Sequence, residues 1–162
     1  VNVSGIGFDA HIANLFTSFT KRGFINYLKI IAKELSYKPK NYKIEYDNIK
    51  REVKAYLIAF ANSSQYGNYF KISPYASASD GLIDFVIVKD FPKWRIPFFL
   101  IKMAKGKVHL SRYVEIIQCK EMEIESNNNL VHLDGEPKEL QSSIIIKIQP
   151  KTLKIFSPNG KE

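Results

Sequence analysis

The sequence predicts a mainly β domain, an antiparallel two-sheet β-sandwich that carries a few helices. Many short stretches alternate apolar and polar residues or are continuously apolar, and turn-forming residues separate them, as in sheet proteins built from hairpins. Helical spacing is confined to the first third of the chain and to one later stretch. With 162 residues, of which 45% are hydrophobic, the chain fits a single globular domain over residues 1–162.

The first third of the chain predicts a short strand followed by two helices. Gly5 and Gly7 close the strand, and Asp9 can cap the helix that follows from about residue 10. A second helix begins near residue 23, because five apolar residues then keep the spacing of one helical face: Phe24, Tyr27, Leu28, Ile31 and Leu35. This helix ends before Pro39.

The hydrophobic period then changes to two, which predicts strands. Residues 42–46 alternate, and the turn-forming pair Asp47-Asn48 leads into a second strand that runs through Val53. Residues 55–61 are nearly continuously apolar and predict a central strand. Further strands fit six ranges: 83–88, 114–118, 122–126, 130–133, 143–148 and 152–156.

One later stretch, residues 91–107, predicts a helix that combines bulky apolar and basic side chains, with Gly106 as its stop. Such a helix is a candidate for lying at the surface of an anionic membrane. The alternative is that its apolar face packs on the sandwich while its lysines are solvated, and the sequence alone favours this second interpretation slightly.

The formal net charge of +8 favours an anionic partner: nucleic acid, a nucleotide or an acidic membrane surface. The single cysteine, Cys119, excludes an internal disulfide and suits a reducing compartment, so a cytoplasmic location is expected. No apolar run approaches the roughly 20 residues of a membrane span, so any membrane contact is expected to be peripheral. His11, His109 and His132 lie apart, without partners at metal-binding spacing, which argues against a zinc site.

Two acidic signatures lie in strand-like surroundings: ISPYASASDGLIDF at residues 72–85 and HLDGEPKEL at residues 132–140. Phosphoryl transfer needs a base for the attacking hydroxyl and Mg²⁺ for the developing charge, and carboxylates can serve both needs. Asp134 and Glu136 fit the first need, and Asp80 fits a hard cation that also accepts backbone carbonyls. The alternative is that both Asp-Gly pairs are ordinary turns.

Five blocks in a fixed order cover nearly the whole chain: GIGFDAHIA at residues 5–13, IAFANSSQYGNYFKISPYASASDGLIDFVIV at residues 58–88, a basic helix ending in MAKGKVH, VHLDGEP at residues 131–137, and a closing IKIQPKTLKIFSP. Together they resemble the C-terminal domain of the diacylglycerol kinase-like lipid kinases, a family that includes soluble bacterial lipid kinases and the sphingosine kinases. The DGE block and the P-x-A-x-x-x-DG-x-x-D pattern around Asp80 are the most specific parts.

The resemblance implies an ATP-dependent kinase that phosphorylates a lipid hydroxyl, such as that of diacylglycerol, in a cleft between this β-sandwich and a nucleotide-binding domain. It implies that Glu136 is the general base and that Asp134 sets the position and charge of Glu136. It also implies a structural Mg²⁺ site with the Asp80 side chain and the backbone carbonyls of Ser77 and Leu82 as ligands.

Two further residues, Asp9 and Asn62, match polar positions that face this cleft, so the resemblance implies contact with the substrate. The chain lacks the family's GGDGT phosphate-binding motif and starts without an initiator Met. We therefore expect the N-terminal nucleotide domain, which holds most of the ATP, to lie outside this chain, and the chain alone to be inactive. Apolar surface that faces the missing domain would be exposed in the isolated chain, and the chain could self-associate through it.

Two other functions remain open. A kinase of the NAD kinase type shares the two-domain plan but phosphorylates a soluble nucleotide. With such a substrate, residues 91–107 are not expected to bind vesicles. A non-catalytic anion-binding module, for example for nucleic acid, fits the charge of +8. Because the lysines are spread over the predicted helices and strands and are not interleaved with aromatic residues, we expect no binding to nucleic acid.

Overall fold

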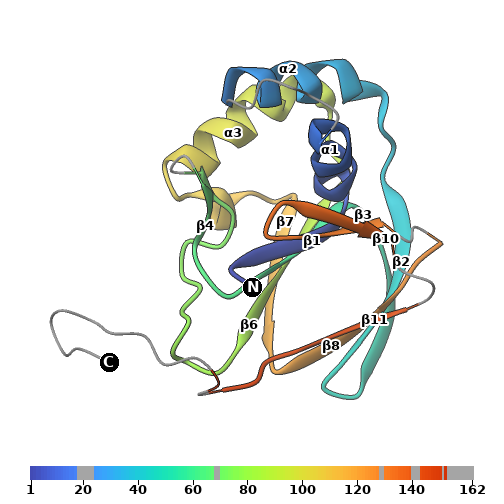
Figure 1. Ribbon diagram of the computed structural model, residues 1–162, viewed down its shortest axis with the longest axis vertical. Coiled ribbons are helices and arrows are strands. Elements are labelled where there is room, and N and C mark those ends of the chain that lie inside the picture. Colours follow the sequence, from blue (N-terminus) through green and yellow to red (C-terminus); the bar gives the residue numbers. More distant parts are fainter. Residues whose placement is uncertain (18–23, 68–69, 128–129, 140–142, 151, 153–162) are drawn as a thin grey trace, which may run out of the picture.

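The computed structural model describes residues 1–17, 24–67, 70–127, 130–139, 143–150 and 152. Most of the described residues that form regular structure lie in antiparallel strands of one large curled sheet, and α-helices cover one end of it (Figure 1). The predicted fold class, a mainly β sandwich-like domain with a few helices, is confirmed.

The described strands of the large sheet are β1 (Val3–Gly7), β2 (Lys40–Tyr46), β3 (Ile49–Ala61), β6 (Ile83–Lys89), β7 (Val114–Cys119), β8 (Glu121–Glu125), β9 (Leu130–Leu133), β10 (Glu136–Glu139) and β11 (Ile144–Lys147). Their order is β10-β9-β1-β3-β2-β8-β11, and β6 joins the sheet between β3 and β7. Two short strands, β4 (Gln65–Gly67) and β5 (Phe70–Lys71), pair with each other.

Strand β3 holds the sheet together, because β1, β2 and β6 all pair with it. It follows β2 through a tight turn in which Asp47 and Asn48 have φ of 46° and 64°, as a two-residue type I′ hairpin turn requires. The sequence suggested two successive strands here, but residues 49–61 form one. The register shifts between Ala55 and Leu57, and an irregularity of this kind bends a strand without ending it.

Buried apolar side chains form two clusters, one on each face of the central strands. The inner cluster fills the space that the curled sheet encloses, and Tyr42, Ile58 and Phe85 belong to it. The outer cluster lies between the sheet and the helices, and Ala59 and Val86 belong to it. Neighbouring residues of β3 and β6 thus alternate between the two clusters. Burial of both faces explains the continuous apolar runs of these strands.

Three α-helices are described, α1 (Phe8–Thr17), α2 (Phe24–Lys33) and α3 (Ile96–Ala104), with the short turns η1 (Glu34–Ser36), η2 (Lys93–Arg95) and η3 (Val108–Leu110). Helix α1 begins at Phe8, directly after β1, so the predicted capping residue Asp9 lies inside its first turn. Helix α3 ends before Gly106, whose φ of 63° is left-handed, as predicted for its stop. Within the described residues, no helix combines the length and apolar character needed to cross a membrane.

Three of the described strands, β4, β5 and β10, were not predicted, and β5 has only two residues. Strand β4 has only three residues, and β10 reads Glu-Pro-Lys-Glu, which shows no apolar alternation because it is the last strand of the described sheet order. Pro137 is tolerated at such an edge. The predicted strand at residues 152–156 lies almost entirely outside the described residues, as do the side chains of Phe24, Tyr27 and Leu28.

The two faces of the sheet give a matched test of the inner cluster. Ile58 is 0% exposed and Ile145, on β11, is 62% exposed. We expect Ile58→Ala to lower the free energy of unfolding by about 2–5 kcal/mol, because it leaves a cavity in the core. Ile145→Ala should change it by less than about 0.5 kcal/mol. Urea unfolding of both variants measures this, and equal losses would show that the inner cluster does not carry the stability assigned to it.

Candidate functional site

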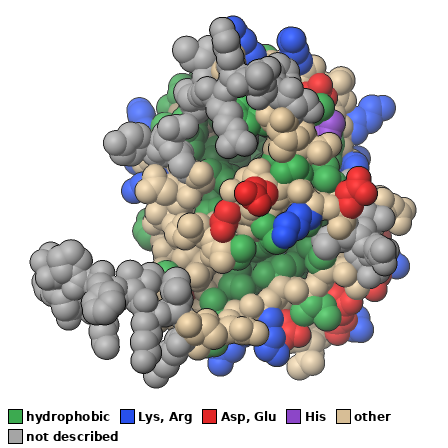
Figure 2. Space-filling view, in the orientation of Figure 1, with side chains coloured by type: hydrophobic (Ala, Val, Ile, Leu, Met, Phe, Trp, Pro, Cys, Tyr) green, Lys and Arg blue, Asp and Glu red, His purple; other side chains and the backbone are tan. Residues whose placement is uncertain are grey.

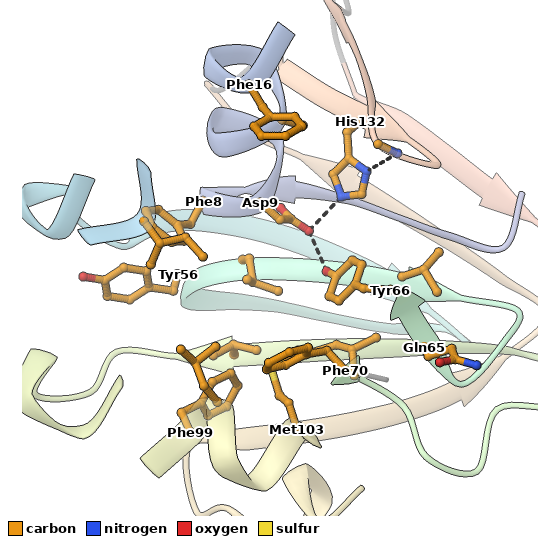
Figure 3. A pocket seen from close by; sticks show the side chains of 18 of the residues that line it. Phe8, Asp9, Phe16, Tyr56, Gln65, Tyr66, Phe70, Phe99, Met103 and His132 are labelled. Atoms are coloured by element: carbon orange, nitrogen blue, oxygen red, sulfur yellow. Dashed lines mark hydrogen bonds and ion pairs between the residues drawn. The ribbon is translucent and has the colours of Figure 1, made fainter. Parts of the chain in front are cut away.

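A cavity of about 790 Å³ lies between the helices and the outer face of the sheet. Aromatic and aliphatic side chains from α1, α3, β3, β5 and β6 form most of its wall, among them Phe8, Tyr56, Phe70, Val88, Phe99 and Met103 (Figure 3). Asp9, Tyr66 and His132 point toward one another on the same wall and form its polar part. The cavity is therefore amphipathic, with a long apolar body beside a compact polar cluster.

Asp9 is the centre of this polar cluster. Its carboxylate is buried, Oδ1 accepts the Ala10 N–H at 2.8 Å, and Oδ2 accepts the Tyr66 hydroxyl at 2.8 Å and His132 Nε2 at 3.0 Å. The Ala10 N–H belongs to the first turn of α1, where backbone donors have no partner within the helix. Donors thus replace the water that the buried carboxylate has lost.

Gly5 in β1 makes room for this carboxylate. A Cβ atom at Gly5 would lie 2.2 Å from Asp9 Oδ2 and 3.0 Å from the Ile58 carbonyl oxygen. Any larger residue would displace the Asp9 side chain, because the strand backbone on the other side cannot yield. The first glycine of the GIGFD block therefore has a steric role in the site.

His132 in β9 connects Asp9 to the acidic turn. Its Nε2 lies 3.0 Å from Asp9 Oδ2, and its Nδ1 lies 3.2 Å from the backbone nitrogen of Gly135. Burial lowers the pKa of His132, but the nearby carboxylate of Asp9 and, more weakly, that of Asp134 raise it, so that the pKa lies above the ordinary value. His132 therefore has two hydrogen-bond partners that are not adjacent in sequence.

The DGE signature forms the tight turn between β9 and β10. Asp134 and Gly135 have φ of 50° and 89°, and Leu133 pairs with Glu136 across the turn. Asp134 Oδ1 accepts the backbone N–H groups of Asn2 and Val3 at 2.7 and 3.1 Å, which binds the turn to the start of β1. The interpretation of this Asp-Gly pair as a turn is correct, and the turn also lines the cavity.

Glu136 follows this turn in the chain, and Asn62 is connected to the turn through Asn2. Neither residue is part of the described cavity wall. Glu136 is the first residue of β10 and its side chain is exposed. Asn62 follows β3, and its N–H donates to the Asn2 carbonyl at 2.8 Å, while Asn2 in turn donates to Asp134. Asn62 Oδ1 is buried and has no hydrogen-bond partner among the described residues.

The predicted metal ligands lie in a separate loop, which is not part of the described cavity wall. Asp80 Oδ1 accepts the Leu82 N–H at 2.9 Å, and Ser77 Oγ lies 3.2 Å from Ser79 Oγ. Asp80, the Ser77 carbonyl and the Leu82 carbonyl offer only oxygen donors, which fits the chemistry of Mg²⁺. In the described residues, no cluster of three or more His, Cys, Asp or Glu side chains could hold a metal ion.

Sequence analysis missed the roles of His132, Tyr66 and Asp84. Asp84, the second acid of the DG-x-x-D pattern, is 2% exposed, accepts Gln118 Nε2 at 2.8 Å and accepts the Ser73 hydroxyl. It thereby ties the loop that carries Asp80 to β6. An acidic residue inside an otherwise apolar strand was the available signal.

A comparison with known families agrees with this architecture. Residues 2–157 match the family described as "YegS C-terminal NAD kinase beta sandwich-like domain". The chain belongs to this family. The predicted resemblance to the C-terminal domains of lipid kinases is thus confirmed, and the YegS C-terminal domain supplies the name for the fold described here.

Curated relatives carry lipid kinase names. The chain is 29% identical over 164 residues to a probable lipid kinase YegS-like of Chromohalobacter salexigens, covering 99% of the chain and 52% of that protein. It is 27% identical over 129 residues to a protein of the same name from Shewanella frigidimarina, covering 79% of the chain and 41% of that protein. The chain thus spans about half the length of these YegS-like relatives or less.

Solved structures share the fold of this YegS C-terminal domain. A putative diacylglycerol kinase from Bacillus anthracis str. Sterne matches 90% of the chain with a TM-score of 0.62 and 22% identity, over 49% of its own length. A diacylglycerol kinase structure from the same strain matches 98% of the chain with a TM-score of 0.64 and 20% identity, over 50% of its own length.

The contact between Asp9 and His132 predicts how His132 titrates. In Asp9→Asn the charge that raises the pKa of His132 is gone while the burial that lowers it remains. We expect the pKa of His132 to fall, as measured by NMR titration of its ring. Asp80→Asn is the matched control, because Asp80 lies in the exposed loop. An unchanged pKa in Asp9→Asn would contradict the assigned ion pair.

Proposed function

We propose that this chain is the substrate-binding and base-bearing C-terminal domain of an ATP-dependent lipid kinase, which phosphorylates the hydroxyl group of a diacylglycerol-like lipid. The observation that carries the proposal is the amphipathic cavity, whose apolar body adjoins the Asp9 cluster and the Asp134-Gly135 turn. The lipid kinase names of the YegS-like relatives support the same activity.

The apolar body of the cavity fits a lipid chain. Its volume of about 790 Å³ lies within the range of about 300–1,000 Å³ that is usual for sites of small molecules. Phe, Tyr, Leu, Val and Met side chains form most of the described wall, and none of the described lining residues is Lys or Arg. A nucleotide would need cations for its phosphates, so this wall favours a lipid over the substrate of an NAD kinase.

In the proposal, the substrate hydroxyl lies at the polar part of the cavity. In the proposed complex, Asp9 and Asn62 bind the polar end of the lipid, since Asn62 Oδ1 is a buried acceptor without a partner among the described residues. Glu136 accepts the proton of the lipid hydroxyl while that oxygen bonds to the γ-phosphorus of ATP. The bond from the γ-phosphorus to the bridging oxygen breaks, and ADP leaves with its electron pair. Asp134 holds the turn that positions Glu136.

ATP and Mg²⁺ are the co-reactants that this chemistry needs. We assign most of the ATP contacts to an N-terminal nucleotide domain outside this chain, because the chain lacks a GGDGT motif. Mg²⁺ supplies charge neutralisation in phosphoryl transfer and has structural uses as well. Asp80, Ser77 and Leu82 would hold it in a structural site. On these assignments we propose that the complete protein acts in phospholipid metabolism, at the cytoplasmic surface of a membrane.

The outer surface of α3 and of the turn η2 before it, called the α3 surface below, supports membrane contact. Trp94, Phe98 and Ile101 are 65%, 60% and 50% exposed, at the spacing of one helical face. The opposite face of α3 lines the cavity through Phe99 and Met103. One short helix therefore separates the proposed lipid site from solvent and is apolar on both sides.

The charges around α3 support an anionic surface as the proposed partner. Lys105 and Lys107 follow the helix and are exposed, and the chain carries a net charge of +8. Apolar side chains beside lysines bind anionic lipid through insertion and Coulomb attraction together. On the face shown in Figure 2, by contrast, most basic side chains lie scattered at the margin and one lies near the centre beside acidic side chains, so no stripe for nucleic acid is seen there.

The role of Glu136 is tested in the complete protein that carries this chain. With labelled ATP, Mg²⁺ and a panel of lipids in mixed micelles, we expect one lipid to be phosphorylated and Glu136→Gln to lower the rate about 10²–10⁴-fold, the usual contribution of a general base. Glu139→Gln is the matched control, because Glu139 is exposed on the same strand. Labelling of a soluble nucleotide instead of a lipid would favour the NAD kinase type, and no labelling at all would favour a binding module.

Membrane contact is tested with the chain itself. We expect the double variant Trp94→Ser and Phe98→Ser to bind phosphatidylserine-containing vesicles about ten- to a hundredfold more weakly, because burial of large apolar side chains is lost. Ile145→Ser, which alters an exposed apolar residue on β11, is the control. Vesicle sedimentation at low and high salt measures binding. Unchanged binding in the double variant would reject the α3 surface, and a dimer that the double variant dissociates would make it a self-association surface.

A further inference from the structure

His132 lies between the two halves of the proposed site, yet no step of the proposed reaction uses it. It is 4% exposed, and its ring contacts Asp9 through Nε2 and the Gly135 N–H through Nδ1. Asp9 is proposed to bind the substrate, and Gly135 directly precedes the proposed base, Glu136. A single buried ring therefore contacts both the proposed substrate-binding residue and the backbone next to the proposed base.

The geometry selects one protonation state of this ring. A backbone N–H can only donate, so Nδ1 must offer its lone pair to Gly135. The carboxylate of Asp9 can only accept, so Nε2 must carry the proton. Both bonds are satisfied together only by the neutral imidazole with its proton on Nε2.

We propose that His132 is a positioning residue that holds the turn bearing Glu136 in register with Asp9, and that it does so only as the neutral ring with its proton on Nε2. Uptake of a second proton at Nδ1 turns this acceptor into a donor that faces another donor. The Gly135 bond then breaks, while the bond to Asp9 is kept and becomes an ion pair. This inference rests on the proposed roles of Glu136 and Asp9.

The surroundings of His132 favour this protonation. The titratable groups that face His132 are Asp9 from α1, Asp134 from the turn and Tyr66 from β4, while Gly5 and Pro137, its partners in β1 and β10, carry no charge. Burial opposes the proton, but the two carboxylates outweigh it and raise the pKa of His132 above the ordinary value.

Fold stability and turn geometry respond to pH in opposite directions. Because the pKa of His132 is raised in the folded chain, the charged ring stabilises the fold fully below the ordinary imidazole pKa of about 6.5. This contribution disappears as the pH rises through the raised pKa. On acidification the fold therefore gains from the ion pair with Asp9 at the same time as the turn loses its bond to Gly135. A purely structural histidine would not separate these two effects.

Two substitutions separate the two bonds of the ring. In His132→Gln, the amide nitrogen replaces Nε2 and still donates to Asp9, but no acceptor remains for the Gly135 N–H. In His132→Asn, the amide oxygen replaces Nδ1 and accepts from Gly135, but the shorter side chain does not reach Asp9. His11→Gln is the control, because His11 lies on the same helix as Asp9, is partly exposed and pairs with Glu34.

The first experiment is an NMR titration of the chain described here. We expect the ring nitrogens of His132 to report the Nε2-protonated neutral form at high pH and the Gly135 amide to shift with the same pKa as the ring. In His132→Asn this Gly135 transition should be absent, and in His11→Gln it should be unchanged. A Gly135 amide that does not follow His132, or neutral rings protonated on Nδ1, would overturn the proposal.

The second experiment measures the pH dependence of lipid phosphorylation by the complete protein. We expect His132→Gln to lower kcat about ten- to a hundredfold with KM preserved, because the base is misplaced while Asp9 stays oriented. His132→Asn should raise KM and remove the acid limb that the wild type shows at the pKa of His132. Unchanged kcat and an unchanged profile in His132→Gln would refute the positioning role. If the wild-type protein phosphorylates no lipid, the proposed function is refuted. The NMR titration alone would then test whether the protonation of His132 is coupled to the Gly135 amide.

Discussion

A buried carboxylate needs hydrogen-bond donors from the protein in place of the water it has lost. The helical end of this domain is arranged around one such carboxylate, the side chain of Asp9. Its donors come from the first turn of α1, from Tyr66 in β4 and from His132 in β9. Gly5 in β1 leaves the necessary space. Four parts of the chain thus meet at a single buried charge, and this fixes the polar part of the cavity relative to the sheet.

The apolar part of the cavity has a different origin. Strands β3 and β6 are buried on both faces, so the face turned toward the helices presents apolar side chains to whatever covers it. Helices α1, α2 and α3 form the cover, but they leave about 790 Å³ unfilled. Open pockets walled mostly by apolar side chains are the usual sites of small-molecule ligands. In the proposed function, the lipid chain occupies this space and completes the outer cluster.

Local sequence patterns predicted much of this fold. Features that depend on contacts between residues far apart in the sequence could not be predicted. The turn at Asp47 and Asn48 and the buried strand β6 have their whole signal in a few neighbouring residues. The bonds of Asp9 to Tyr66 and His132 span 57 and 123 residues. No spacing rule shows such a pair, so His132 looked like a scattered histidine. For Glu136, Asp134 and Asp80 the motifs gave positions along the chain, but only the fold shows that Asp134 lines the cavity wall while Asp80 lies in a separate loop.

The exposed side chain of Glu136 has a consequence for chemical selectivity. A base that is open to solvent removes a proton from a water molecule as readily as from an alcohol, and in the proposed reaction water would divert the phosphoryl group into hydrolysis. Preference for the alcohol then depends on position and on exclusion of water. A lipid whose chain fills the cavity brings its own apolar bulk to the Asp134-Gly135 turn. The bound substrate itself would then exclude water from the site. The complex with lipid would be protected against hydrolysis of ATP, and the empty domain would not.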